Sequence, residues 1–479
     1  MKLLFAASEC VPFFKTGGLG DVVGALPKEL AKQGHDVRVV LPYFLQKIPE
    51  EYKEEMEDVI NFEVEVGWRN VYCGIKKLKK DQVTYYFIDN EFYFARDNLY
   101  DYGDDAERFA FFQLAAIEML EVLDFFPDIF HVNDWQTAVI PVLLKDKYNW
   151  KDQLRDIRTV LTIHNIMFQG IYDQEVLSDL FGIGYNAFHE HGLKYYESVN
   201  FLKGGIYYSD LVTTVSPTYA LEIQTPAFGM GLHQDLQEIS NKLVGLLNGI
   251  DYDLFDPETD PTLPANFSKE DLAGKAENKK ALQEVAKLPL KEDVALVGVV
   301  TRLDEQKGIQ LIIDAMDELM TYRNVQMVLL GTGKDYFEDA FHYFNDKYPE
   351  KFRAIIDFDV DLAQLIYAGS DLFLMPSAFE PCGLSQMNSM RYGTLPLVHE
   401  VGGLADTVHP YHHLTGVGTG FSFYDFESDV LLHVIDNALM LYYDYPKQWR
   451  SLIEQAMSEN NSWEKAAKAY VEQYEQLIF

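Results

Sequence analysis

The chain has 479 residues, 48% hydrophobic and 24% charged, and its 75 acidic residues against 40 basic ones give a formal net charge of −35. This composition excludes a disordered or fibrous chain, and the charge argues against binding to nucleic acid or to an anionic membrane surface. The length predicts two domains, because single hydrophobic cores stop growing beyond about 250–300 residues.

The opening residues, MKLLFAAS, predict a β-strand rather than a signal peptide. Their apolar core, LLFAA, is shorter than the roughly 7–15 residues of a signal-peptide core, and no uninterrupted apolar stretch in the chain approaches the roughly 20 residues of a membrane helix. The three cysteines are scattered and lack metal-ligand spacing, which is typical of a reducing compartment. We therefore expect a cytoplasmic protein that does not bind membranes.

A glycine-rich loop follows this strand, in the stretch KTGGLGDVVGALP (15–27). Such a loop at the start of a helix lets the backbone approach a ligand closely, and that ligand often carries phosphate. Nine residues (ECVPFFKTG, 9–17) separate the strand from the glycines of GLGDVVG (18–24), and the second strand ends in Pro-Tyr-Phe without an acid. Both features argue against a dinucleotide oxidoreductase. No Gly-Lys-Ser/Thr follows the glycines, which excludes a Walker loop.

Short apolar strands alternate with helix-length amphipathic segments through most of the chain. The pattern predicts buried parallel strands at 2–8, 37–42, 128–133, 158–164 and 210–216, helices at 105–123 and 135–147, and an antiparallel excursion at 62–66, 71–79 and 82–88. A Pro/Asp/Asn-rich stretch at 243–267 indicates a domain boundary. A second set of strands is predicted at 294–302, 325–333, 353–358, 371–377 and 394–400.

This alternation, present twice, predicts two doubly wound α/β domains. Ligands bind beyond the carboxyl ends of strands in open parallel sheets, so we expect the site in a cleft between the two sheets.

Two segments of the second half carry candidate chemistry. TRLDEQKG (301–308) places Arg302 and Lys307 where a strand ends and a helix begins, which is typical of a pyrophosphate site; the alternative is ordinary solvated surface. FEPCGLS (379–385) places Glu380 before a helix start, where a carboxylate can bind sugar hydroxyls or oppose a developing positive charge. The alternative for Glu380 is a simple helix-start acid.

Together these segments resemble the family of bacterial glycogen synthases and plant starch synthases. The resemblance rests on K-T-G-G-L, H-N-I-M-F-Q-G (164–170), L-N-G-I-D (247–251), R-L-x-E-Q-K-G, and F-E-P-C-G-L followed by R-Y-G-T-x-P and G-G-L-A-D-T-V, and it runs over the whole chain. It implies a GT-B glycosyltransferase with two Rossmann-like domains facing a deep cleft, at 1–245 and 246–460. It also implies a C-terminal helix within 461–479 that crosses back to the first domain.

The resemblance further implies retaining transfer of glucose from ADP-glucose to the non-reducing 4-hydroxyl of an α-1,4-glucan such as glycogen, without a metal or cofactor. The implied catalytic residues are Glu380, His164, Arg302, Lys307 and Asp134. The implied donor-binding residues are Lys15, Gly17, Gly18, Asp21, Asn248, Arg302, Lys307, Phe358, Cys382, Gly383, Leu384 and Ser385. Tyr100 and Asp134 are the implied acceptor-binding residues. We expect Cys382 to pack rather than to attack, since no base is evident beside it.

Three positions depart from the family's usual pattern. Asp357-Phe358 replaces Gly-Tyr beneath the adenine, so the ring is kept but a hydroxyl is lost. Asn133 stands where histidine is common. Asn388 stands where many related retaining transferases carry a second glutamate, an absence that the glycogen-synthase branch shares. We interpret DFDVD (357–361) as a helix-start acid cluster and not as a metal-binding motif.

Several alternatives stay open at this level. The same fold can serve a UDP-glucose-dependent synthase or a transferase with another acceptor, and a catalytically silent glucan-binding scaffold is a third possibility. A pyridoxal-dependent glucan phosphorylase is disfavoured, because such chains are far longer and no cofactor-lysine segment is recognisable. The sequence does not predict the oligomeric state.

Overall fold

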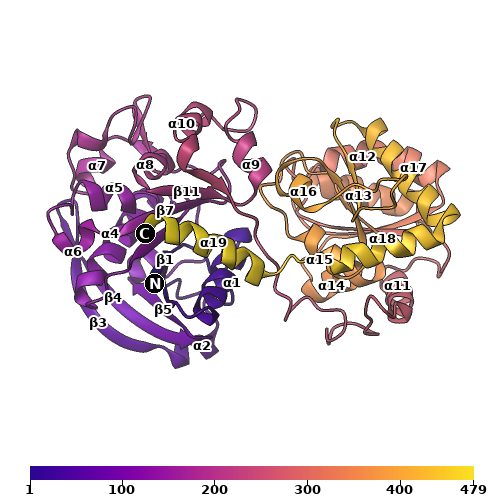
Figure 1. Ribbon diagram of the computed structural model, residues 1–479, viewed down its shortest axis with the longest axis horizontal. Helices are drawn as coiled ribbons and strands as arrows, with labels where there is room; N and C mark the ends of the chain where they lie inside the picture. Colours follow the sequence, from indigo (N-terminus) through magenta and orange to yellow (C-terminus); the bar gives the residue numbers. More distant parts are fainter. Residues whose placement is uncertain (479) are drawn as a thin grey trace. The chain divides into compact units, whose positions relative to one another are not determined.

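The computed structural model describes residues 1–478 and divides into two compact units (Figure 1). Unit 1 contains Met1–Leu246 together with the C-terminal segment from Trp463 onward, and unit 2 contains Leu247–Ser462. The chain therefore passes from unit 1 into unit 2 and returns to unit 1 for its last helix.

Unit 1 is built on a nine-stranded sheet with the order β12-β11-β7-β6-β1-β2-β5-β4-β3. Its strands are β1 (Lys2–Ala6), β2 (Asp36–Pro42), β3 (Glu57–Val66), β4 (Arg69–Lys80), β5 (Val83–Asp89), β6 (Ile129–Asn133), β7 (Arg158–Ile163), β11 (Leu211–Thr214) and β12 (Leu243–Gly245). The strands from β12 to β5 pair in parallel, and β4 and β3 extend the sheet antiparallel. β1 lies at the centre of the parallel part, which explains why its side chains after Lys2 are fully buried and apolar.

Short turns join β3 to β4 and β4 to β5, and the other connections of unit 1 contain helices and one small sheet. A three-stranded sheet is formed by β8 (Ile171–Asp173), β10 (Ser198–Asn200) and β9 (Lys194–Tyr195). The α-helices are α1 (Gly18–Lys32), α2 (Glu50–Glu55), α3 (Glu91–Phe94), α4 (Asp105–Val122), α5 (Ile140–Lys145), α6 (Asp152–Arg155), α7 (Val176–Asp179), α8 (Phe201–Tyr208), α9 (Pro217–Glu222), α10 (His233–Glu238) and α19 (Trp463–Ile478). Two 3₁₀ turns lie at Tyr185–Ala187 and Ser240–Lys242.

The C-terminal helix α19 is part of the core of unit 1. It packs beside α1 in Figure 1, and its face toward the unit buries Tyr470 and Tyr474 completely. The Tyr474 hydroxyl lies 2.6 Å from Nδ1 of the buried His131 on β6, and the other ring nitrogen of His131 lies 2.6 Å from Thr162 Oγ1 on β7. The helix is thereby tied to two central strands of the sheet.

Unit 2 is a six-stranded sheet with the order β15-β14-β13-β16-β17-β18, and all its strands pair in parallel. The strands are β13 (Ala295–Val300), β14 (Val325–Leu330), β15 (Phe352–Ile355), β16 (Leu372–Met375), β17 (Leu395–His399) and β18 (Phe421–Phe423). The helices are α11 (Ala273–Val285), α12 (Ile309–Tyr322), α13 (Asp335–Lys347), α14 (Val360–Gly369), α15 (Ser385–Arg391), α16 (Gly402–Thr407), α17 (Ser428–Asp444) and α18 (Pro446–Ser458). In Figure 1, α12 and α17 lie on one side of the sheet, and α11 and α14 lie on the other.

The same order of strands occurs in both units. Counted along the chain within each sheet, the order in unit 2 is 3-2-1-4-5-6, and the parallel part of unit 1 follows it with β5, β2, β1, β6, β7, β11 and β12. This is the doubly wound Rossmann order, in which the direction of winding reverses between the first and fourth strands. The predicted α/β class with two such domains is confirmed.

One detail of the predicted elements was wrong. The predicted helix 135–147 begins only at Ile140, because the residues after Asp134 form turns. Within the predicted boundary stretch 243–267, Leu243–Gly245 form β12, which completes the sheet of unit 1.

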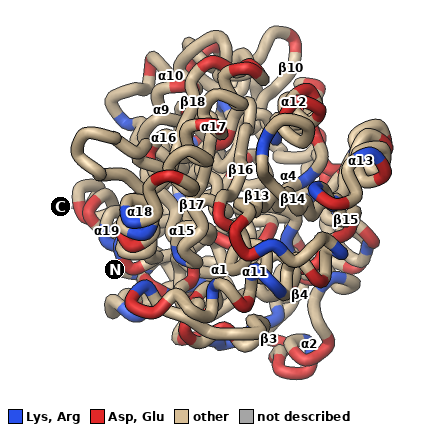
Figure 2. Tube along the Cα trace, turned by 90° about the vertical axis from the view of Figure 1, so that its right-hand side faces the viewer, with Lys and Arg blue, Asp and Glu red and all other residues tan. Residues whose placement is uncertain are grey.

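The described residues also show whether a helix could span a membrane and how the acidic residues are distributed. Within residues 1–478, no helix is long and apolar enough to cross a membrane. Figure 2 shows Asp and Glu spread along the chain rather than gathered on one element, in keeping with the strongly negative composition.

Candidate active site

The sequence-predicted residues of unit 1 follow its central strands at the carboxyl edge of the sheet. Lys15, Gly17 and Gly18 come after β1, Asp134 directly follows β6, and His164 directly follows β7. The point where winding reverses lies between β1 and β6. Ligands of open α/β sheets bind outside the carboxyl ends of the strands at this point, so the topology brings these residues to the part of unit 1 that is best suited to a site.

The glycine-rich loop donates hydrogen bonds to the carboxylate of Glu9, a residue that is only 4% exposed. One oxygen of Glu9 accepts hydrogen bonds from the backbone N–H groups of Thr16 (2.6 Å) and Gly17 (3.0 Å). The other accepts from the hydroxyls of Thr16 (2.8 Å) and Tyr100 (2.8 Å). Helix α1 then begins at Gly18 without a side-chain cap, which leaves its amino end available to an anion.

Lys15 and Asp21, both predicted to lie near the donor, are brought together. Lys15 Nζ lies 2.8 Å from Asp21 Oδ1, and both side chains are partly exposed. An exposed pair of this kind contributes little to stability, so the lysine can exchange its carboxylate partner for a ligand phosphate at small cost.

Asn133, Asp134 and His164 form a second cluster. The Asn133 amide nitrogen donates to Ala6 O (3.0 Å), so its oxygen faces His164 Nε2 at 2.9 Å and accepts the hydrogen bond. This contact sets the proton of the neutral imidazole on Nε2 and leaves the lone pair on Nδ1, which makes no hydrogen bond to a described residue. Asn133, noted above as a departure from the family pattern, therefore fixes the tautomer of His164.

Burial shifts the pKa values of this cluster strongly. Burial lowers the pKa of His164 to about 3, so the ring is neutral at physiological pH. Burial also raises the pKa of Asp134 to about 7, and the nearby Glu9 carboxylate acts in the same direction. Hydrogen bonds from the backbone N–H groups of His164 (2.7 Å) and Asn165 oppose that shift. Asp134 also has a positive φ of 55°, a backbone conformation that is uncommon for a residue other than glycine.

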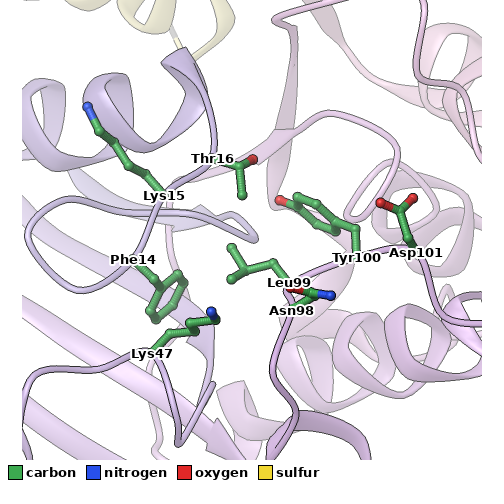
Figure 3. Close-up of a pocket in the computed structure, with 8 residues that line it drawn as sticks. All are labelled: Phe14, Lys15, Thr16, Lys47, Asn98, Leu99, Tyr100 and Asp101. Carbon is green, nitrogen blue, oxygen red and sulfur yellow. The ribbon is translucent and has the colours of Figure 1, made fainter. Parts of the chain in front are cut away.

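A cavity of about 370 Å³ adjoins the glycine-rich loop (Figure 3). It is lined by Phe14, Lys15, Thr16, Lys47, Asn98, Leu99, Tyr100 and Asp101. Figure 3 shows the hydroxyl ends of Thr16 and Tyr100 turned toward one another. Tyr100, predicted on the acceptor path, thus lines a cavity, but its hydroxyl proton is directed to Glu9, and Ser8 Oγ contacts the same oxygen at 2.7 Å.

In unit 2 the structure brings Lys307 and Glu380 together. Lys307 follows β13 and Glu380 follows β16, the two strands between which winding reverses. Lys307 Nζ lies 2.6 Å from Glu380 Oε2, and Ser377 Oγ donates to the same oxygen at 3.0 Å. Glu380 is only 6% exposed. Arg302 stands apart from this pair, largely exposed and 3.6 Å from Asp304.

Two glycines allow the backbone to approach this pair closely. Gly308 has a φ of +69°, and a Cβ there would lie 1.9 Å from Pro376 O; Gly402 has a φ of +45°, and a Cβ there would lie 1.9 Å from Glu380 O. Both positions combine a left-handed backbone with contact to another backbone, so no other residue fits them without a shift. The loops after β13 and β16 are thereby held against their neighbours.

The other predicted donor residues gather around Glu380, with one exception. Cys382 is buried, burial raises the pKa of its thiol to about 12, and the backbone of Asn248 contacts the sulfur. This supports packing rather than nucleophilic attack. Gly383 and Leu384 precede α15, and Tyr367 donates to Ser385 Oγ at 3.0 Å. Phe358 is instead 81% exposed.

Within residues 1–478, no group of three or more His, Cys, Asp or Glu side chains is arranged to hold a metal ion. In DFDVD, Asp359 caps α14 by accepting a hydrogen bond from the Leu362 N–H at 2.9 Å, as expected for a helix-start acid.

Sequence reasoning missed two residues that the structure places in these clusters. Glu9 follows β1 within ASEC, and Ser377 follows β16 within MPS. In each case the available signal was a polar side chain just beyond the carboxyl end of a buried strand next to the point of reversal. Such a position is occupied by functional groups in many parallel sheets.

The comparisons with known proteins agree with this arrangement. Residues 2–238 match the family model of the starch synthase catalytic domain, and residues 281–456 match that of glycosyl transferases group 1. The chain is 54% identical to a glycogen synthase of Lactococcus lactis and 55% identical to one of Ligilactobacillus salivarius, and it covers all of each relative and is itself fully covered.

Two solved structures are similar to this chain. The chain resembles the catalytic domain of starch synthase IV from Arabidopsis thaliana, solved with ADP and acarbose, with a TM-score of 0.92 and 35% identity over 100% of this chain and 99% of that one. A sucrose-phosphate synthase from Thermosynechococcus elongatus, 16% identical with a TM-score of 0.62, shares the fold alone.

Two Rossmann-like units, each with polar groups where its winding reverses, define a glycosyltransferase of the GT-B fold. The chain belongs to the family of glycogen and starch synthases.

Proposed function

We propose that the protein transfers glucose from ADP-glucose to the non-reducing 4-hydroxyl of an α-1,4-glucan, with retention of configuration. The observation that carries the proposal is the Lys307–Glu380 pair at the reversal point of unit 2, in which Glu380 is buried and Lys307 is partly buried. A cation there can take the charge that builds on the departing diphosphate, and a carboxylate can bind the transferred sugar. The relatives named glycogen synthase and the ADP in the starch synthase structure support the choice of donor.

In unit 2 we assign Arg302 and Lys307 to the diphosphate and Glu380 to the transferred glucose. Lys307 is already held by a carboxylate, so its ammonium group is positioned before the donor binds. Arg302 is exposed and can adjust to the ligand. The neighbouring residues around Cys382 and Asn248 line the sugar pocket in this proposal, and the exposed ring of Phe358 stacks on the adenine.

In unit 1 the glycines themselves support a role for the K-T-G-G loop in binding phosphate. A Cβ at Gly17 or Gly18 would meet no described atom within 4 Å, whereas one at Gly20 would lie 2.5 Å from Lys15 Cβ. Packing within the protein explains Gly20 but leaves Gly17 and Gly18 without a structural reason. Close approach of a ligand to the backbone, together with the uncapped amino end of α1 and Lys15, supplies one.

For the acceptor we assign Asp134 and Tyr100. A carboxylate whose pKa is near 7 can accept the proton of the attacking hydroxyl at neutral pH. The neutral His164 beside it presents an acceptor nitrogen, Nδ1, that is suited to a sugar hydroxyl. No metal or cofactor has a role in this proposal, and a cytoplasmic location stays a prediction.

The decisive test is incorporation of labelled glucose into glycogen from ADP-glucose and, in parallel, from UDP-glucose, each with and without EDTA. We expect transfer from ADP-glucose that EDTA does not reduce. Transfer from UDP-glucose alone would show that Asp357-Phe358 has changed base selectivity, and loss of activity in EDTA would contradict metal independence. Transfer from neither donor would favour another acceptor or a silent scaffold.

The pH dependence of transfer provides a further prediction. Because the pKa of Asp134 is raised to about 7, its carboxyl is protonated below that pH and cannot act as a base. The kcat/KM for the acceptor is therefore expected to rise with pH and to level off above about pH 7. A profile that stays flat down to pH 5, measured where thermal denaturation shows an intact fold, would contradict this role for Asp134.

A further inference from the structure

Glu9 has no assigned role in the proposed reaction, yet it makes more hydrogen bonds than any assigned side chain of unit 1. An ionised carboxylate has about four lone-pair sites and accepts only. Four donors occupy these sites: the Thr16 and Gly17 N–H groups, the Thr16 hydroxyl and the Tyr100 hydroxyl. Glu9 is thus fully satisfied as a buried anion, and every partner belongs to one of two segments.

The first of these segments is the K-T-G-G loop. The two N–H groups that Glu9 binds immediately precede α1, so the carboxylate fixes the backbone where the helix begins. The first turn of α1, which has no side-chain cap, then keeps a defined direction. This geometry serves the donor phosphate in the proposed function.

The second segment contains Tyr100, which lies 91 residues further along the chain. Since the single hydroxyl proton of Tyr100 is directed to Glu9, Ser8 Oγ donates to the tyrosine oxygen at 2.7 Å. Thr16 and Tyr100 both line the cavity in Figure 3, whereas Glu9 is not a lining residue. Glu9 therefore hydrogen-bonds two lining residues of that cavity, Thr16 and Tyr100, without lining the cavity itself.

We infer that Glu9 is a positioning residue that holds the donor-binding loop and the acceptor-side Tyr100 in one arrangement, so that both substrates depend on the same buried carboxylate. This inference rests on the proposed function. Glu9 touches neither substrate in it and acts through Thr16, Gly17 and Tyr100.

The test compares Glu9→Ala and Glu9→Gln with the unaltered protein, using KM and kcat for ADP-glucose and for malto-oligosaccharide, and the unfolding temperature. Alanine removes all four hydrogen bonds, and we expect both KM values to rise about tenfold or more, since small displacements of positioning groups are costly. Glutamine can turn its oxygen to the two N–H groups and its NH₂ to the hydroxyls, which can reorient. It should restore both KM values to within about threefold.

Glu29→Ala is the matched control. Glu29 is an acid on α1 that pairs with Lys32 and makes no contact with the loop, and its removal should leave both KM values unchanged. Lower unfolding temperature in Glu9→Ala, with both KM values unchanged, would reduce Glu9 to a purely structural residue and overturn the inference.

A double-mutant cycle tests the coupling directly. Tyr100→Phe should lower kcat/KM for the acceptor in the unaltered protein but have little further effect in the Glu9→Ala background, because the hydroxyl has then lost its partner. Equal effects in both backgrounds would contradict the coupling. Failure of the proposed function is distinguishable, since the unaltered protein would then show no transfer from ADP-glucose in the same assay.

Discussion

Glu380→Ala is expected to lower kcat/KM for ADP-glucose by about 10²–10³-fold, the range found when one stabilising group of a transition state is removed. The carboxylate is buried, 2.6 Å from Lys307 Nζ and 3.0 Å from Ser377 Oγ. Its loss removes a contact to the transferred sugar in the proposed function. It also leaves the Lys307 ammonium group without its partner, so the cation that serves the diphosphate is no longer held in place.

Steady-state kinetics with ADP-glucose and glycogen measure this effect, and thermal denaturation shows whether the variant is folded. Glu380→Gln keeps the shape of the side chain but not its charge, and it should also lose most activity. The control is Glu318→Ala, an exposed acid on α12 that pairs with Arg323 and should behave as the unaltered protein does. A folded Glu380→Ala variant that retains activity within about threefold would remove Glu380 from the proposed mechanism.

Tyr474→Ala should destabilise unit 1 by about 3–5 kcal/mol, the usual cost of deleting a large buried aromatic ring. Tyr474 is fully buried on α19, and its hydroxyl contacts His131 on β6. The substitution opens a cavity against the central strands and leaves a buried ring nitrogen unpaired. For a unit of this size, we expect the unfolding temperature to fall by roughly 6–20 °C, measured by differential scanning calorimetry.

Two further variants separate the contributions of Tyr474. Tyr474→Phe removes only the hydroxyl and should cost about 1–3 kcal/mol, through the unpaired nitrogen of His131. Glu472→Ala changes an exposed position of the same helix and should have almost no effect. If Tyr474→Ala unfolds at the temperature of the unaltered protein, α19 is not the structural part of unit 1 that its burial indicates.

Local patterns were sufficient to predict most strands of the two larger sheets and the residues that follow them. Runs such as KLLFA and ALVGVV are buried on both faces of a sheet, so their composition alone marks them. The residues after their carboxyl ends were then natural candidates, among them Lys307 and Glu380. Their pairing at 2.6 Å joins positions 73 residues apart, and no local pattern predicts it.

The role of Glu9 and the start of the helix after Asp134 were not predicted, because both depend on tertiary contacts and not on a local pattern. Glu9 has partners 7, 8 and 91 residues away, so its role appears only when the loop and Tyr100 have been brought together. The apolar run after Asp134 has helical composition, but Asp134 adopts a positive φ, and residues 135–139 of the run form turns. Tertiary contacts, among them the hydrogen bond from the Asn133 N–H to Thr137 Oγ1 at 2.6 Å, override the helical propensity there.

The return of the chain to unit 1 has a consequence for synthesis on the ribosome. Everything from Leu247 to Ser462 is made before α19 emerges, and α19 supplies buried side chains to the sheet of the first unit. At a translation rate of about 5–20 residues per second, roughly 10–45 s pass between the synthesis of Leu246 and that of α19. During that interval the surface on β6 and α1 that α19 later covers is open to water and to chaperones, so the first unit to be translated is the last to be completed.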